Sequence, residues 1–173
     1  MSSSSRIEEL RRRVQSDPAS IAFAQLAEEY RRAGQLADAV TVCRDGLDTH
    51  PGFISARSTL GRALLALDRL NEAEAELAAV VEAAPGNLAA TRALADTQHR
   101  LGNLEAALAG YQRAFELAPK DPDLERHIAD LIDTLAAAAR QAAESRRARA
   151  AATIAALERW MEAIRAARSH QLS

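Results

Sequence analysis

Aromatic residues and cysteine are scarce in this chain of 173 residues. Aromatics make up 3% of it, so its core must be built from aliphatic side chains. Cys43 is the only cysteine, which excludes a disulfide within the chain and fits a reducing compartment, so we expect a cytoplasmic protein. Uninterrupted apolar runs of about 18 residues, which a membrane-spanning helix needs, are also missing, and we expect no membrane partner.

An excess of charge of one sign is missing too. The 22 basic and 24 acidic residues leave a net charge of −2. Domains devoted to nucleic acid usually carry a clear basic excess, so we expect no nucleic-acid partner. The Ser-rich segment 1–5 is followed by charged residues rather than by an apolar run, and it is predicted to be a disordered tail, not a signal peptide. No glycine-rich phosphate loop is present, and no cofactor is expected.

Alanine and leucine dominate what remains, and both favour helix. The sequence therefore predicts an all-α fold. Residues 6–17 form a first short helix, because Ile7, Leu10 and Val14 lie on one face of it and Asp17-Pro18 ends it.

A fixed period follows. Prolines stand at 18, 51, 85 and 119, in steps of 33, 34 and 34 residues, which is typical of a stacked repeat protein. The period defines repeats at 20–53, 54–87 and 88–121. Each repeat has the same residue type at four positions: a leucine (Leu26, Leu60, Leu94), a small residue (Ala27, Gly61, Ala95), a second leucine (Leu36, Leu70, Leu104) and an alanine (Ala39, Ala73, Ala107).

The small residues have a physical reason. Two helices of one repeat cross closely at these positions, and a larger side chain there would push them apart. Gly34 and Gly102 fall in the turns between the paired helices, where they suit a left-handed helix end.

This pattern resembles the tetratricopeptide repeat, a helix–turn–helix unit of 34 residues. The leucine, small, alanine and proline positions agree in all three copies. The family's large positions vary, being Phe23, Arg57 and Thr91 at the Trp site, Tyr30, Leu64 and Gln98 at the Tyr site, and Cys43, Leu77 and Tyr111 at the Phe site. The resemblance implies an α-solenoid, in which helix 6–17 acts as an N-terminal cap similar to the second helix of a degenerate repeat.

After Pro119 the pattern changes. Leu124, Ile128, Ala129, Ile132 and Leu135 continue the register of a first helix, so 122–144 is predicted to cap the third repeat. No glycine or proline follows Pro122, and the helix should run on to about Arg168.

The last part, 145–170, is predicted to be an amphipathic extension. Its apolar seam consists of Ile154, Leu157, Trp160, Met161 and Ile164. The seam predicts self-association or capture of a partner helix. Alternatively, the chain bends near Glu144-Ser145 and folds this helix back onto the solenoid.

The family resemblance implies a peptide-binding groove on the first helices of the repeats. The predicted groove residues are Glu28, Arg31, Arg32, Arg62, Arg92, Asp96, His99 and Arg100. Arginine suits carboxylates, so the expected ligand is an acidic peptide segment or a terminal carboxylate. The alternative is a solvated basic face, or one neutralised by Asp123, Asp130 and Asp133. The Lys/Asn/Asn/Lys/Arg clamp of relatives that bind heat-shock-protein tails is replaced here, so we predict no binding of such tails; its positions hold Ala24, Glu28, Thr59, Ala89 and Ala93.

Catalytic patterns are weak. Asp96 and His99 lie one turn apart and could form half a dyad or half a metal site, but no third ligand accompanies them. Cys43 occupies a core position, and the basic run Arg140–Arg149 is predicted to be solvated. We therefore expect no catalytic residues, no metal and no enzyme. The predicted function is a scaffold or adaptor that binds a peptide or helix of another protein; the alternative is a secretion- or assembly-type chaperone that holds a client segment.

Overall fold

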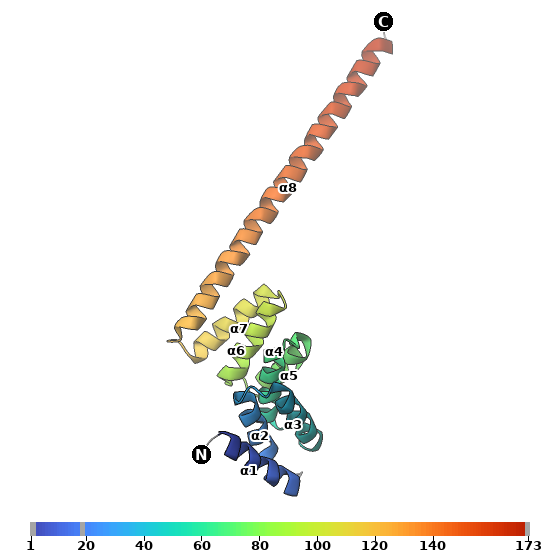
Figure 1. The fold of residues 1–173 in the computed structure, drawn as a ribbon. Helices are drawn as coiled ribbons and strands as arrows, with labels where there is room; N and C mark the ends of the chain where they lie inside the picture. The colour runs from blue at the N-terminus through green and yellow to red at the C-terminus, as the bar shows by residue number, and fades with distance from the viewer. Residues whose placement is uncertain (1–2, 18–19, 172–173) are drawn as a thin grey trace. The chain divides into compact units, whose positions relative to one another are not determined.

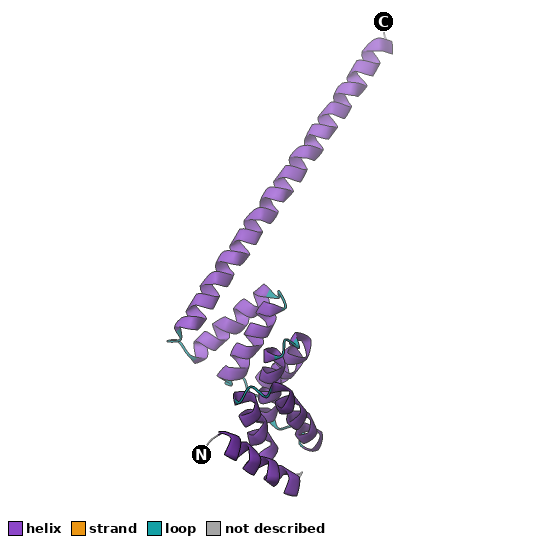
Figure 2. Ribbon diagram, viewed as in Figure 1, coloured by secondary structure: helices purple, strands orange, loops and turns teal. Residues whose placement is uncertain are grey.

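The computed structural model describes residues 3–17 and 20–171, and in these residues it contains helices and no strand (Figures 1 and 2). The helices are α1 (Ser3–Ser16), α2 (Ala22–Arg32), α3 (Leu36–Thr49), α4 (Ile54–Ala66), α5 (Leu70–Ala83), α6 (Leu88–Arg100), α7 (Leu104–Leu117) and α8 (Pro122–Gln171). The fold is an α-solenoid of paired helices, as the sequence predicts. The chain divides into two units, Met1–Leu131 and Ile132–Ser173.

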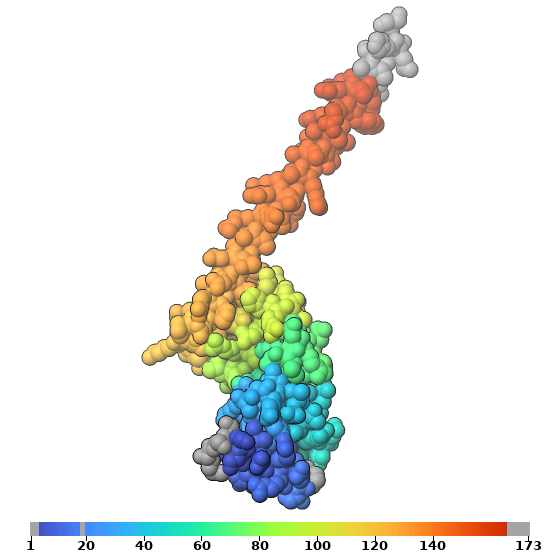
Figure 3. Space-filling view, viewed as in Figure 1, coloured from blue at the N-terminus to red at the C-terminus, as the bar shows by residue number. Residues whose placement is uncertain are grey.

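The N-terminal helix is longer than predicted. Helix α1 begins at Ser3, so the segment predicted as a disordered tail is helical from Ser3 onward, while residues 1 and 2 lie outside the described part. Pro18, the first proline of the period, also lies outside it. Ile7 and Leu10 are buried against repeat 1, where α1 lies against α2 (Figure 3). The role of an N-terminal cap stays a prediction.

Each repeat is one helix pair, namely α2 with α3, α4 with α5, and α6 with α7. The small positions are fully buried, as predicted. At Gly61 in α4, a Cβ would lie 2.6 Å from Cγ of Leu77 in α5, so this crossing has no room for a side chain. Close approach of the two helices is therefore the reason for small residues here.

The turns inside the repeats use a left-handed residue. Gly34 has φ 76° and Gly102 has φ 82°, as expected from their places in the sequence. Repeat 2 has Asp68 at the equivalent place, with φ 61°, although residues other than glycine rarely adopt this backbone conformation. An aspartate is among the residues that tolerate it best.

Two polar replacements at the family's large positions have structural explanations. Arg57 donates to Glu76 over 2.6 Å and to the Pro51 carbonyl over 2.9 Å, so its charge is satisfied. Thr91 is buried and its hydroxyl donates to the Asn87 carbonyl of its own helix. Neither replacement therefore leaves its polar side chain without a hydrogen bond.

The last helix enters the solenoid differently from the prediction. Leu124, Ile128 and Leu131 pack on α7. Ile132, predicted to dock, is 47% exposed, because the buried stripe of α8 follows residues 124, 128 and 131. Tyr111 of α7 also stacks on His127, with ring centroids 4.9 Å apart. The first three turns of α8 thus close the first unit.

Helix α8 is continuous through Glu144-Ser145, so the bend that the alternative interpretation needs is absent there. The polyalanine run at 136–139 explains the continuity. Its 50 residues correspond to a length of about 75 Å. None of the helices in the described residues combines the length and the apolar character of a membrane span.

Candidate functional site

The predicted groove residues all lie on the first helices of the repeats. Helix α2 carries Glu28, Arg31 and Arg32, α4 carries Arg62, and α6 carries Arg92, Asp96, His99 and Arg100. Helix α4 packs against both α2 and α6. The three first helices thus lie side by side. We use the name concave face for these eight residues, after the peptide-binding surface that the family resemblance implies.

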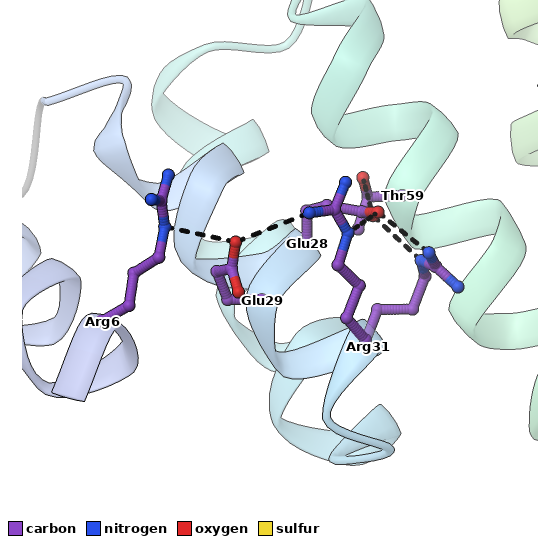
Figure 4. Close-up of polar contacts among 6 residues, drawn as sticks. Arg6, Glu28, Glu29, Arg31 and Thr59 are labelled. Atoms are coloured by element: carbon purple, nitrogen blue, oxygen red, sulfur yellow. Dashed lines mark hydrogen bonds and ion pairs between the residues drawn. The ribbon is translucent and has the colours of Figure 1, made fainter. Parts of the chain in front are cut away.

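Glu28 is the centre of a charged cluster on α2 (Figure 4). Arg31 donates to both of its carboxylate oxygens over 2.9 Å, and Arg32 donates to Oε1 over 3.0 Å. Thr59 of α4 donates to Oε2 over 3.3 Å. The hydrogen bond from Arg31, helped by the positive charges nearby, outweighs partial burial and lowers the pKa of Glu28 to about 2. Glu28 is therefore ionised and already occupied.

A second acid lies beside it. Glu29 forms an ion pair with Arg6 of α1 at 3.3 Å (Figure 4) and another with Arg32 at 3.7 Å. The sequence prediction omitted Glu29, although its spacing to Arg32 on one helix is a recognisable ion-pair signal. Arg32 is thus shared between two glutamates.

The arginines of α6 also have partners within the chain. Arg92 lies 2.8 Å from Asp121 and 3.6 Å from Asp123. Arg100 donates to Asp68 over 2.7 Å and to the Leu65 carbonyl over 2.9 Å. The predicted internal neutralisation therefore occurs at Arg92. It includes Asp123, and also Asp121, which was not among the predicted acids.

Asp96 and His99 do not form a dyad. The Tyr111 hydroxyl donates to Asp96 over 2.6 Å, while the His99 ring meets the Tyr111 ring edge-on. Burial, and next the hydrogen bond to Asp96, raises the pKa of Tyr111 above its ordinary value. Asp96 is therefore engaged by a neutral phenol.

The single thiol of the chain is held in an unreactive form. Cys43 is fully buried, its thiol donates to the Ala56 carbonyl, and burial raises its pKa to about 12. The thiolate needed for a nucleophile is thus disfavoured. Across residues 3–17 and 20–171, no group of three or more His, Cys, Asp or Glu side chains is placed to hold a metal ion.

Arg62 differs from the other arginines of the concave face. It is half-buried and, within the part of the chain that the structure describes, it has neither a hydrogen bond nor an ion pair. Burial lowers its pKa, and the neighbouring positive charge of Arg31 lowers it further, while Glu28 acts in the opposite direction. It is a cation in surroundings that disfavour its charge.

Arg62 lines a hollow of about 330 Å³ between α4 and α6. Its lining contains both apolar and charged side chains, namely Arg31, Arg62, Leu65, Ala66, Ala89, Arg92, Ala93 and Asp96. A second hollow of about 380 Å³ lies where α1, α2 and α4 meet, and includes Ile21 and Phe53. Ile21 is 58% exposed and lies in this hollow beside charged lining residues, which include Arg6, Glu29 and Arg32.

The seam residues predicted for association are in the second unit. Ile154, Leu157, Trp160 and Met161 are exposed on α8, and Ile164 is half-buried. These residues form a surface of their own in the second unit.

Comparisons with known proteins agree with this architecture. Two profiles described as tetratricopeptide repeat match residues 30–86 and 93–121. Over 117 residues the chain is 31% identical to protein O-mannosyl-transferase Tmtc1 of Drosophila melanogaster; the match covers 64% of this chain and 14% of that protein. The chain thus corresponds to a small part of that relative.

Solved structures show the same fold. MamA of Desulfovibrio magneticus RS-1 superposes with a TM-score of 0.70 at 23% identity, over 75% of this chain and 73% of that one. The first repeat domain of human RPAP3 superposes with a TM-score of 0.62 at 19% identity, over 69% and 94%. A related structure shows the first repeat domain of RPAP3 bound to the HSP90 peptide SRMEEVD. The helix pairs, their period and these matches together identify the chain as a member of the tetratricopeptide repeat family.

Proposed function

We propose that the chain is a scaffold whose concave face binds an extended segment of another protein, and that Arg62 binds one acidic group of that segment. Stacked repeats of this kind provide a preorganised surface made of neighbouring helices. The observation that carries the proposal is Arg62, a half-buried cation without a partner in the described chain, at the edge of a hollow.

The ion pairs around Arg62 indicate which chemical group of a ligand would bind there. Arg31, Arg92 and Arg100 are neutralised by acids of the chain itself. Arg62 is the groove cation that this internal pairing leaves over. A carboxylate from a ligand would supply the missing partner, and a guanidinium binds such a group through two parallel hydrogen bonds.

The hollow beside Arg62 is small. Its volume of about 330 Å³ is at the lower end of ligand pockets, roughly 300–1,000 Å³. It therefore suits a single side chain or a chain terminus rather than a folded element. The second hollow, around Ile21 and Phe53, shares Glu28 and Arg32 with the predicted groove and offers the same segment an apolar patch beside charged groups.

The test compares peptides that differ only in charge. A peptide library in which each Asp or Glu is paired with its amide counterpart would be screened by fluorescence anisotropy against the full chain. We expect selection of a carboxylate at one fixed position, and a 10- to 100-fold loss of affinity in Arg62→Gln, which is roughly the value of a charge-assisted hydrogen bond of 1.5–3 kcal/mol.

Arg113→Gln is the matched control, because Arg113 is an exposed arginine on α7, outside the predicted groove positions. It should leave affinity unchanged. Equal binding of acid and amide peptides, or full affinity of Arg62→Gln, would contradict the proposal. Binding without any preference among peptides would instead favour the chaperone alternative.

A further inference from the structure

The second unit exposes an apolar seam without a partner in the described chain. Over residues 154–161 of α8, Ile154 is 56% exposed, Leu157 54%, Trp160 65% and Met161 45%. Exposed apolar surface of this kind marks an interaction site in a soluble chain. The question is what covers it.

The spacing of the seam is symmetric along the helix. Ile154, Leu157, Met161 and Ile164 follow one another at intervals of three, four and three residues. Read in the opposite direction, the intervals are the same. Two antiparallel copies centred near residue 159 therefore bring Ile154 level with Ile164 and Leu157 level with Met161, so each seam residue faces a seam residue.

The charges next to the seam favour the antiparallel pair over the parallel pair. Arg147 and Arg140 continue the seam one and two heptads upstream of Ile154, and both are exposed. A parallel pair in register would place each arginine against its own copy, and like charges facing each other destabilise a pair. In the antiparallel register the two Arg147 residues are 24 residues apart along the helix axis, or about 36 Å, which is beyond the screening length of physiological salt.

The two flanks of the seam differ. On one flank Glu158 lies one residue from the centre at 159, so the Glu158 carboxylates of two copies would approach each other and weaken the pair, with Arg165 one heptad further along the same flank. Trp160 lies on the other flank, close to the two-fold axis, where it would contact Trp160 of the second copy. A two-fold interface of this kind is the commonest form of self-association.

We infer that residues 154–164 of α8 bind the same segment of a second copy of this chain, antiparallel and centred near residue 159. The contact is short, about three helical turns, and belongs to the transient class that buries less than about 1,200 Å². The pairing is therefore expected only at high concentration, or where a partner on the concave face brings copies together.

The experiment uses the full chain and its single tryptophan. Sedimentation velocity over two decades of concentration should show monomer changing to dimer, and Trp160 emission should shift to the blue over the same range. Leu157→Glu should abolish both changes. Ala152→Glu introduces the same charge on an exposed position outside the seam and should abolish neither. Both positions are exposed in the single chain, so neither variant threatens folding.

Orientation is tested by disulfide formation in air. Ile154→Cys mixed with Ile164→Cys should form the mixed disulfide, whereas each variant alone should not, because identical positions are about 15 Å apart along the axis. Cys43 is buried and does not compete. Disulfides within single variants would show a parallel pair and overturn the inference. A monomer at every concentration would overturn it too, as would seam-dependent binding to anionic vesicles by a chain that stays monomeric.

Discussion

Gly61→Ala is a substitution for which sequence and structure predict opposite effects. Repeats 1 and 3 have Ala27 and Ala95 at this position, so agreement among the repeats favours alanine. Alanine also improves an exposed helix by about 1 kcal/mol over glycine. In the structure, however, the new Cβ would lie 2.6 Å from Cγ and 2.8 Å from Cδ2 of Leu77.

The clash should outweigh the gain in helix propensity. Carbon atoms in contact are normally about 3.5–4.0 Å apart, so Leu77 or the helix pair must shift by about 1 Å. Overpacking of this kind costs about 1–3 kcal/mol. Subtracting the propensity gain of about 1 kcal/mol leaves a net loss of stability of about 1 kcal/mol.

Cys43 provides the assay. Its thiol is fully buried and bonded to the Ala56 carbonyl of α4, so a thiol reagent reacts only after α3 and α4 separate. When opening is fast compared with labelling, the labelling rate follows the opening equilibrium. A loss of about 1 kcal/mol then accelerates labelling about fivefold, since 1.4 kcal/mol corresponds to a factor of ten.

Repeating Gly61→Ala in a chain that also carries a substitution at Leu77 shows whether the contact with Leu77 causes the loss of stability. In Leu77→Ala the Cγ and Cδ2 atoms that meet the new Cβ are both removed, so Gly61→Ala should become neutral or stabilising in that background. Gly86→Ala is the control, because nothing lies within 4 Å of its new Cβ. Unchanged or slower labelling in Gly61→Ala, or equal acceleration in both backgrounds, would refute the reasoning.

Three further predictions concern the charged residues and the turns. The pKa of Glu28 is lowered to about 2, so its ionised form stabilises the fold above about pH 4.5. This contribution, of order 2–3 kcal/mol, is lost as the pH falls towards 2. In Glu28→Gln the free energy of unfolding, measured with urea, should therefore depend less on pH in that range, and a pH dependence parallel to wild type would contradict the prediction. Asp68→Ala should lower the free energy of unfolding by about 1 kcal/mol, because alanine tolerates the left-handed conformation poorly. Asp68→Gly should change it by less than half as much. Equal thermal midpoints for the two variants would count against backbone strain. The peptide SRMEEVD should show no saturable binding by calorimetry, because the ionised Glu28 occupies a clamp position that needs a donor; a saturable isotherm would disprove this.

The helix pairs could be predicted because local rules and tertiary packing agree in them. A leucine, a small residue and a proline recur every 34 residues, and the helices cross where the small residues lie. The continuity of α8 was predictable for a similar reason, since no glycine or proline interrupts it after Pro122.

The electrostatics of the concave face could not be predicted from its residue types. The five arginines look equivalent in the sequence, but four of them pair with acids of the chain. The partners Asp68 and Asp121 lie 32 and 29 residues from the arginines they bind, in the turns after α4 and α7. Only the stacking of repeats determines these distances, so the distinct state of Arg62 appears only in the structure.

The composition of α6 has a consequence for how the first unit unfolds. Ala90 and Ala93 belong to the core shared with repeats 1 and 2, whereas Ala95 belongs to the core shared with α7 and the start of α8. The buried side chains of α6 are all alanine or threonine, so little apolar area couples the two cores. In a linear array, stability is a sum of repeat and interface terms, and the weakest interface separates first. Hydrogen exchange should therefore divide the unit within α6, with amides on its two sides exchanging as separate cooperative groups.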